Sequence, residues 1–391
     1  MLLESRTIDR VQQTLRIDRP IVYFTSPGVV LVSDQIHLLL PASSMLENGS
    51  HFFEGVEKLL EIWFEESSNG DDDLRNISRS DWENVLSNVN CQIISTSKND
   101  IIDAFVLSES SMFVSKRRWI LKTCGTTTPL KCLGQLLKLA EANGYNVVAD
   151  LFYSRKNFTR PEAQITPHQG FTEEVTYLDS IFPNGRSYCL GSMNLECWYL
   201  YTFSRSDIKI SPQLISDDKN VDSDPDQTIE ILMQDLDPET MSIFYKNKFN
   251  DANGATVKSG IDTILPTMHI DDFLFDPCGY SMNGINDKGE YMTIHITPEN
   301  QFSYVSFETN VALSNYRKLI NQVINTFKPG KFIVTIFANK CSLAYETMKE
   351  LEVEYSQGSH WKRTDMQCCN FPSYNLLFAQ YSHSEKTGDN L

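Results

Sequence analysis

The N-terminal half of the chain contains the stretch AFVLSESSMFV at residues 104–114, followed closely by WILKTCGTT at residues 119–127. Runs of this kind, rich in Phe, Val, Ile and other apolar residues, are typical of buried strands. They place the Glu109-Ser110 bond between two strand-like runs, with Cys124 fourteen residues after the serine. The segment is therefore our first candidate for both the sheet core and the chemistry of the chain.

The composition predicts a globular protein with a large core. Of the 391 residues, 41% are hydrophobic and 11% aromatic, which suffices for one large domain or two ordinary ones. The 51 Asp and Glu residues outnumber the 34 Lys and Arg residues, giving a net charge of -17. This charge disfavours nucleic acids and favours cationic ligands such as sulfonium compounds or polyamines, although solubility alone accounts for it equally well.

The nine cysteines indicate a reducing environment. Their number is odd and they form no Cys-x-x-Cys pair, which argues against a disulfide framework and against a zinc ribbon. We therefore expect a cytoplasmic protein without a metal site. We also expect neither a membrane span nor a signal peptide, because no uncharged apolar run reaches about 18 residues.

Residues 1–44 differ from the rest of the chain. They mix arginines with acidic residues and end in the sequence PASS at residues 41–44. We predict that they form an appended, poorly ordered extension, with Met45 as the candidate start of the functional protein. A transit peptide is the alternative, which the acidic residues disfavour.

The pattern of apolar residues predicts a mixture of helices and strands. Helical spacing occurs at residues 54–65, 130–143, 171–182, 227–236 and 313–327. Strand-like runs occur at residues 91–95, 104–107, 119–124, 198–203, 291–297, 302–308, 331–337 and 375–381. Alternation within these runs predicts antiparallel sheets. We expect an α/β chain of the α+β type, a four-layer αββα sandwich with two antiparallel sheets facing each other and helices on the outer faces. No internal repeat is visible.

The segment around Glu109 and Ser110 resembles the self-cleavage site of the eukaryotic, pyruvoyl-dependent S-adenosylmethionine decarboxylases. Further segments resemble this family in the same order, at residues 51–63, 107–118, 121–127, 152–158, 181–185, 225–232, 275–284, 293–299, 302–310 and 327–332. The resemblance implies a single domain at residues 45–391 that cleaves itself between Glu109 and Ser110. The products would be a β chain ending at Glu109 and an α chain whose first residue, Ser110, becomes a pyruvoyl group.

The resemblance also implies a reaction. The twenty side chains include no electrophilic carbonyl, and an amino acid decarboxylase needs one to delocalise the electrons released with CO2. The pyruvoyl cofactor would form a Schiff base with the amine of S-adenosylmethionine. The decarboxylated product would be the aminopropyl donor for spermidine and spermine synthesis.

Catalytic roles follow from the resemblance as well. Cys124 would protonate the α-carbon after CO2 leaves, a task that a thiol with a pKa of about 8.5 performs at neutral pH. During processing, Ser281 would steady the acyl-shift intermediate and His295 would remove the α-proton of the ester. His295 shares a predicted strand face with other polar residues, which also fits an ordinary hydrogen-bonded histidine.

The substrate site implied by the resemblance combines aromatic and acidic side chains. Glu54 and Glu57 lie three apart on one face of the predicted helix and would line a site for a cationic substrate. Two aromatic residues would sandwich the adenine and one carboxylate would accept both ribose hydroxyls. The aromatic pair is Phe53 and Phe275, and the carboxylate is Glu299. The set of residues implied to bind substrate also includes Leu107 and Glu109.

A second set of residues resembles the buried acidic site that binds the activator putrescine in the animal enzymes. Its members are Glu61, Lys122, Phe152, Asp226, Thr228, Glu230, Glu308, Phe337 and Tyr374. A diamine there would cancel the repulsion between the carboxylates, and Lys122 would link their charge to Cys124, two residues away. Plant relatives depart from this pattern, so the presence of Asp226 favours an enzyme that responds to putrescine.

Each candidate residue also has an ordinary structural explanation, such as a core aromatic, an inert buried cysteine or a neutralised acidic cluster. For the whole chain, the alternative function is that of a catalytically inactive homologue that acts as a regulatory partner. The presence of Ser110, Cys124, Ser281 and His295 counts against it. The implied partners are S-adenosylmethionine, putrescine and the chain's own β chain, in a homodimer of two-chain units as in the animal enzymes.

Overall fold

The computed structural model describes residues 24–25, 29–30, 52–67, 70–205, 225–249, 251–344, 360–371 and 373–383. The chain divides into two compact units, residues 1–51 and 52–391. In the first unit, β1 (Phe24–Thr25) pairs antiparallel with β2 (Val29–Val30). The rest of the predicted extension at residues 1–44 lies outside the described residues. None of the helices in the described part of the chain is long and apolar enough to cross a membrane.

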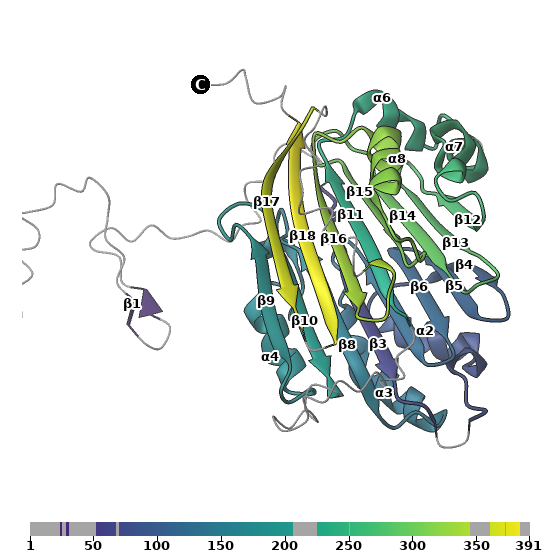
Figure 1. Ribbon diagram of the computed structural model, residues 1–391, viewed down its shortest axis with the longest axis vertical. Coiled ribbons are helices and arrows are strands. Elements are labelled where there is room, and N and C mark those ends of the chain that lie inside the picture. Colours follow the sequence, from purple (N-terminus) through teal and green to yellow (C-terminus); the bar gives the residue numbers. More distant parts are fainter. Residues whose placement is uncertain are drawn as a thin grey trace, which may run out of the picture. The chain divides into compact units, whose positions relative to one another are not determined.

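The second unit contains two eight-stranded sheets in which every neighbouring pair of strands is antiparallel (Figure 1). The first sheet has the order β4 (Ile93–Lys98), β5 (Ile102–Leu107), β6 (Ser110–Ser115), β7 (Arg118–Thr123), β3 (Lys58–Phe64), β8 (Val148–Lys156), β10 (Cys197–Ser204) and β9 (Arg186–Gly191). The second has the order β12 (His269–Leu274), β13 (Tyr280–Ile285), β14 (Tyr291–Thr297), β15 (Tyr304–Thr309), β11 (Gln227–Gln234), β16 (Lys331–Asn339), β18 (Tyr374–His383) and β17 (Trp361–Asn370).

The two sheets have the same topology. Counted from its own first strand, each sheet runs 2-3-4-5-1-6-8-7 in chain order. The unit is therefore built from two copies of one arrangement, although inspection of the sequence finds no repeat. The apolar and polar residue types at matching positions differ too much for the repeat to be visible in the sequence, whereas strand pairing preserves it.

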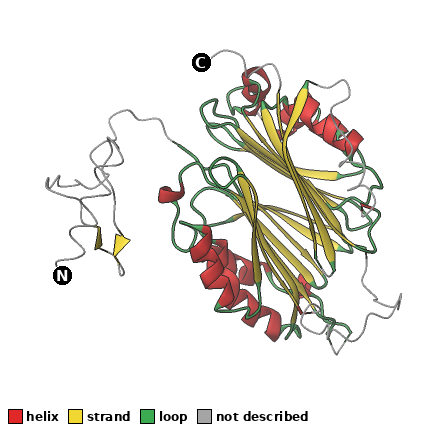
Figure 2. Ribbon diagram, turned by 60° about the vertical axis from the view of Figure 1, so that its left-hand side comes forward, coloured by secondary structure: helices red, strands yellow, loops and turns green. Residues whose placement is uncertain are grey.

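Helices cover the outer face of each sheet, as Figure 2 shows. Over the first sheet lie α2 (Arg79–Ser87), α3 (Leu133–Ala142) and α4 (Phe171–Asp179), and over the second lie α6 (Pro238–Met241), α7 (Ala252–Ser259) and α8 (Arg317–Phe327). Short 3-10 helices are η2 (Leu74–Asn76), η3 (Pro129–Cys132), η4 (Pro161–Ala163), η5 (Ser242–Phe244) and η6 (Ile261–Thr263). The predicted four-layer αββα sandwich is confirmed.

Two predicted helices are wrong. Residues 54–65 form a loop followed by β3, and residues 227–236 contain β11. In both strands the side chains alternate between the helices outside and the other sheet. Leu60, Ile62 and Phe64 pack under the helices, whereas Glu61 points between the sheets. The buried charged positions broke the simple apolar alternation and left a spacing that also fits a helix.

The space between the sheets holds two separate apolar clusters. One joins β5, β6 and β7 to β13 and β14, and includes Phe113 and Tyr291. The other joins β9 and β10 to β11, β15, β16 and β18, and includes Trp198 and Phe378. Between them, the central strands β7, β3, β15 and β11 carry charged side chains. The sheets are thus held together by apolar contacts around a charged centre.

Replacing Phe113 tests the first of these apolar clusters. Its ring centroid lies 4.5 Å from that of Tyr291 in the other sheet, and its side chain is 1% exposed. Phe113→Ala should lower the free energy of unfolding by about 3–5 kcal/mol, because it leaves a cavity between the sheets. Urea denaturation measures this, with Leu195→Ala as the control at a 69% exposed position. The control should change stability by less than about 0.5 kcal/mol, and equal losses would contradict the packing described.

Candidate active site

The Glu109-Ser110 bond lies at the turn of a β-hairpin. Leu107 of β5 pairs with Ser110 of β6, so Ser108 and Glu109 form a two-residue turn. Ser110 has a φ of 113°, which a serine rarely adopts. Such a conformation costs on the order of 1–3 kcal/mol and persists only where the surroundings hold it. The bond therefore lies between two strands, as predicted from the sequence, and its serine is strained.

Groups from the loop before β3 and from the end of β7 surround this bond. Ser110 is buried, and its Oγ donates a hydrogen bond to Glu57 Oε1 at 3.2 Å. The backbone N–H of Cys124 donates to the carbonyl oxygen of Glu109 at 3.2 Å. The Cys124 Sγ lies 3.9 Å from Glu109 Oε2. Both the hydroxyl and the carbonyl of the Glu109-Ser110 bond thus have hydrogen-bond partners.

The second sheet contributes a histidine with three hydroxyl neighbours. His295 pairs with Ser281 across β13 and β14, and its Nδ1 is 2.8 Å from Ser281 Oγ. Its Nε2 lies 2.8 Å from Thr293 Oγ1 and 3.0 Å from Ser111 Oγ. Burial lowers the pKa of His295 well below its ordinary value, and the Lys122 ammonium adds to this effect. The ring is therefore neutral at pH 7.

Ser111 is a β6 residue whose side chain points at the second sheet. Its Oγ contacts His295 and donates to Asn283 Oδ1 at 2.6 Å. Sequence analysis missed both Ser111 and Asn283. The available signal was the period of two along β6, since Phe113 also faces the second sheet.

Glu57 is the carboxylate shared by the hairpin and the charged centre. Its Oε1 accepts the hydrogen bond from Ser110 and lies 3.8 Å from His295 Nε2. Its Oε2 lies 3.6 Å from Lys122 Nζ. Burial raises the pKa of Glu57 to about 7, against the opposing effect of Lys122. Glu57 is therefore poised between its charged and neutral forms at physiological pH.

Glu54 does not share a face with Glu57, because the predicted helix is absent. Its Oε2 accepts hydrogen bonds from the backbone N–H groups of Thr159 and Arg160 at 2.9 and 3.0 Å. Burial raises the pKa of Glu54, and these backbone hydrogen bonds oppose the increase. Glu54 therefore ties the loop before β3 to the segment after β8.

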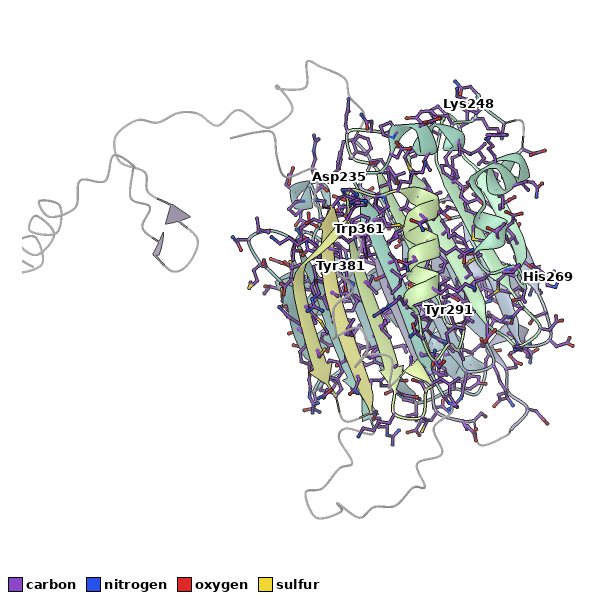
Figure 3. The ribbon with its side chains drawn as sticks, turned by 45° about the horizontal axis from the view of Figure 1, so that its top comes forward. Asp235, Lys248, His269, Tyr291, Trp361 and Tyr381 are labelled. Atoms are coloured by element: carbon purple, nitrogen blue, oxygen red, sulfur yellow. The ribbon has the colours of Figure 1, made fainter. Side chains whose placement is uncertain are left out.

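Lys122 lies at the centre of the charged groups between the sheets. Its Nζ is 2.7 Å from Glu230 Oε1 and 2.7 Å from Glu308 Oε2. Burial opposes the charged form, but the attraction of these carboxylates and of Glu57 outweighs it and holds the pKa of Lys122 well above its ordinary value. Tyr291, labelled in Figure 3, donates its hydroxyl to Glu308 Oε1 at 2.7 Å.

Arg118 provides a second cation that sequence analysis missed. Its Nε lies 2.7 Å from Glu61 Oε1, and its Nη1 lies 3.6 Å from Asp226 Oδ1. Trp63 donates to Glu61 at 2.6 Å, and Tyr374 donates to Asp226 at 3.2 Å. Burial raises the pKa of Glu61 to about 7, although Arg118 opposes the increase. We call the seven residues Glu57, Glu61, Arg118, Lys122, Asp226, Glu230 and Glu308 the charged cluster.

Aromatic rings lie at the Asp226 end of the charged cluster. Phe337 stacks on Tyr374 with ring centroids 4.6 Å apart, and Phe152 meets both rings edge-on at 4.8 and 5.2 Å. Thr228 pairs with Phe337 across β11 and β16. The structure therefore brings the residues predicted for the second set together around one centre, and adds Arg118 and Tyr291.

The predicted substrate residues come from both sheets. A Cβ added to Gly125 would lie 3.1 Å from the Phe53 ring, so this ring packs on the turn that follows Cys124. Phe275 follows β12 and its N–H bonds the Gly279 carbonyl at 2.9 Å. Glu299 follows β14. Burial raises the pKa of the Cys278 thiol to about 12, and the Glu299 carboxylate adds to this increase.

Leu107 and the pocket beside Phe53 lie in different surroundings. Leu107 is fully buried at the end of β5, within the apolar cluster beneath the helices. A pocket of about 390 Å³ lies beside Phe53 and is also lined by Glu54, Phe158 and Tyr304. Of the five residues predicted to bind substrate, only Phe53 lines this pocket, so the pocket does not coincide with the predicted substrate site.

Comparison with known proteins identifies relatives along almost the whole second unit. The family model of adenosylmethionine decarboxylase matches residues 50–382. The S-adenosylmethionine decarboxylase proenzyme of Drosophila melanogaster is 99% identical over 347 residues, which are 89% of this chain and 100% of the relative. That of Xenopus laevis is 50% identical over 344 residues, 86% of this chain and 97% of the relative.

A solved structure also resembles this chain. The crystal structure of the Trypanosoma brucei AdoMetDC-delta26 monomer matches with a TM-score of 0.53 and 25% sequence identity, covering 70% of this chain and 98% of that chain. The resemblance and the fold class predicted from the sequence are therefore confirmed. This chain belongs to the adenosylmethionine decarboxylase family.

Proposed function

We propose that this chain decarboxylates S-adenosylmethionine through a pyruvoyl group that it makes from its own Ser110, and that putrescine stimulates it. Family membership supports the decarboxylase and its part in polyamine synthesis. The observation that carries the rest is the strained Ser110, with a carboxylate on its hydroxyl and a backbone donor on the preceding carbonyl. These residues fit the formation of such a group in the chain itself.

The first step is an N-to-O acyl shift. Ser110 Oγ attacks the carbonyl carbon of Glu109, the C–N bond breaks, and the freed amine keeps the proton that the hydroxyl loses. Glu57 accepts the hydrogen bond of the attacking hydroxyl, and the Cys124 N–H stabilises the negative charge that develops on the Glu109 oxygen. Release of the backbone strain at Ser110 lowers the barrier further.

The second step is an elimination that breaks the chain. His295, neutral because of its burial, removes the α-proton of residue 110. A Cα=Cβ double bond forms in residue 110 while the bond between its Cβ and the ester oxygen breaks, so Glu109 leaves as a carboxylate. Ser281, Thr293 and Ser111 hold the ring by hydrogen bonds. Addition of water and loss of ammonia then leave the ketone of the pyruvoyl group.

In decarboxylation the pyruvoyl group supplies the electron sink, and this chain supplies the binding and the proton. Burial raises the pKa of Cys124 well above its ordinary value, as do Glu109 and Glu57, so the thiol is protonated at neutral pH and acts as the acid. Phe53, beside the Cys124 turn, packs against the adenine together with Phe275.

Putrescine binding follows from the charge balance of the charged cluster. Five carboxylates surround the two cations Lys122 and Arg118, so the fully ionised cluster has a deficit of positive charge. A diamine relieves the repulsion, and Phe337 and Tyr374 provide apolar contact for its methylene chain. Glu57 carries the effect to Ser110, because it contacts both Lys122 and the serine.

The names of the relatives favour the enzyme over the inactive regulatory homologue, since they are decarboxylase proenzymes. A homodimer of two-chain units, a cytoplasmic location and a functional start at Met45 stay predictions.

Replacing the serine tests self-cleavage. Ser110→Ala should leave a single uncleaved chain without decarboxylase activity, because alanine lacks the attacking oxygen. Denaturing gels and intact mass measure the number of chains. Ser108→Ala, in the same hairpin turn, is the matched control and should still yield two chains. Cleavage in the Ser110→Ala variant would remove the proposed nucleophile.

Replacing one carboxylate tests the activator site. Asp226→Asn should raise the putrescine concentration needed for half-maximal stimulation by about tenfold or more, because a hydrogen bond to a charged group contributes about 1.5–3 kcal/mol. Stimulation should fall more than turnover without putrescine. Asp287→Asn, in an exposed turn, is the control. An unchanged response in Asp226→Asn would exclude this site.

The raised pKa of Glu61 predicts how putrescine binding depends on pH. Below its pKa of about 7 the carboxyl group is neutral and attracts the dication less, so binding should strengthen as the pH rises. One such group gives about tenfold weaker binding at pH 6 than at pH 8. Calorimetry on the wild type and on Glu61→Gln measures this. The variant should lose about tenfold of the dependence, and equal slopes would contradict the role of Glu61.

A further inference from the structure

The turn formed by Cys124 and Gly125 is held at four backbone groups. The Cys124 N–H bonds the Glu109 carbonyl, and the Cys124 carbonyl accepts from Thr127 Oγ1 at 2.6 Å. The Gly125 N–H bonds the carbonyl of Glu54 at 2.8 Å. The Gly125 carbonyl accepts from a charged group, the ammonium of Lys58, at 2.9 Å. Gly125 itself has a φ of +60°, which favours glycine.

Lys58 is a fully buried lysine at the start of β3. Its side chain is 0% exposed, and its Nζ contacts Gln164 Oε1 at 3.1 Å besides the Gly125 carbonyl. The Phe158 ring lies on a third side, with its centroid 5.1 Å away. Burying an ammonium group costs several kcal/mol unless hydrogen bonds or opposite charges compensate the lost hydration.

We propose that Lys58 is a positioning residue of this enzyme: its ammonium group fixes the Cys124–Gly125 turn and holds a positive charge 2.9 Å from the carbonyl of the residue that follows Cys124. This inference rests on the proposed function only for the use that the enzyme makes of the thiol. The effect on the thiol itself belongs to the folded chain, whether or not it is cleaved.

The charge matters because the surroundings of the thiol are apolar and acidic. Burial, Glu109 and Glu57 all raise the pKa of Cys124, whereas the Ser110 hydroxyl and Lys58 lower it. In the Ser110→Ala background Lys58 is the one of these two that remains. Burial lowers the pKa of Lys58 itself to about 8. Titratable and charged groups near Lys58 come from the loop before β3, the loop before β4, the hairpin turn, the turn after β7, the strand β8, the loop before α4 and α4 itself. They are Glu54, Cys91, Glu109, Cys124, Arg155, His168 and Glu174.

A purely structural ion pair does not account for Lys58. Glu174, a buried carboxylate of α4, is already bound by Arg155 Nε at 2.8 Å and by His168 Nδ1 at 2.7 Å. Tyr153 donates to the same carboxylate. The hydrogen bonds of Lys58 go instead to the Cys124–Gly125 turn and to Gln164.

The test measures the reactivity of the thiol in the single-chain Ser110→Ala background, where no cleavage or turnover interferes. Iodoacetamide alkylation of Cys124 is followed by peptide mass spectrometry from pH 7 to pH 10, relative to the exposed Cys341 in the same molecules. Lys58→Met removes the ammonium group. It should slow Cys124 alkylation at pH 7 by about tenfold, because a neighbouring cation shifts a pKa by about one unit or more. The difference should disappear towards pH 10, where Lys58, with its pKa of about 8, is neutral in the parent chain as well.

Two further variants separate charge from folding. Lys58→Gln keeps a hydrogen-bond donor for the Gly125 carbonyl but not the charge, and it should slow alkylation similarly even where Lys58→Met fails to fold. Lys156→Met removes another buried lysine, whose partner Glu196 stays paired with Lys331 at 2.6 Å. This control should change the ratio of the Cys124 alkylation rate to the Cys341 alkylation rate by less than about twofold. An unchanged ratio in Lys58→Gln, or an equal change in Lys156→Met, would overturn the proposal.

Kinetics of the processed enzyme then distinguish this inference from the proposed function. Lys58→Gln should lower kcat while KM stays within about twofold, because the thiol is used after the substrate has bound. Slower alkylation with an unchanged kcat would leave the role of Lys58 intact and remove Cys124 as the acid. Unchanged alkylation would remove the role of Lys58 and leave Cys124 as the acid.

Discussion

The burial of charge between two sheets is the constraint on which the rest of this structure depends. Lys122 reaches from the first sheet to Glu230 and Glu308 of the second, with both distances at 2.7 Å. A buried ion costs several kcal/mol, and removing one partner of such a pair leaves the other uncompensated. The charged cluster therefore allows only a narrow range of relative positions of the two sheets, while the apolar clusters on either side supply the adhesion.

The same constraint sets the protonation states at the hairpin. Glu57 contacts the charged cluster through Lys122 and the hairpin through Ser110, and its pKa of about 7 leaves it responsive to either side. His295 stays neutral and Cys124 stays protonated, because burial disfavours the charged form of each. A neutral imidazole and a protonated thiol thus arise from one low-dielectric environment.

The duplicated topology explains where the charges lie. Glu61 is the fourth residue of β3 and Glu230 the fourth of β11, the first strands of their sheets, and both point between the sheets. Lys122 and Glu308 are each the fifth residue of the equivalent strands β7 and β15. Two copies of one arrangement, packed face to face, bring four such positions together, which neither sheet does alone.

Prediction from the amino-acid sequence succeeded for elements that the pattern of neighbouring residues specifies. These include the strand-like runs on either side of Glu109 and Ser110, the helix α8, the strand β14 with His295 on its polar face, and, through resemblance, the family. It failed at β3 and β11, because charged residues on the inner face disguised their alternation. The contacts of Ser111, Arg118, Tyr291 and Lys58 with the candidate active site and the charged cluster are visible in the folded chain alone. Their partners lie on distant strands, and contacts between two facing sheets leave no spacing along one chain from which they can be read.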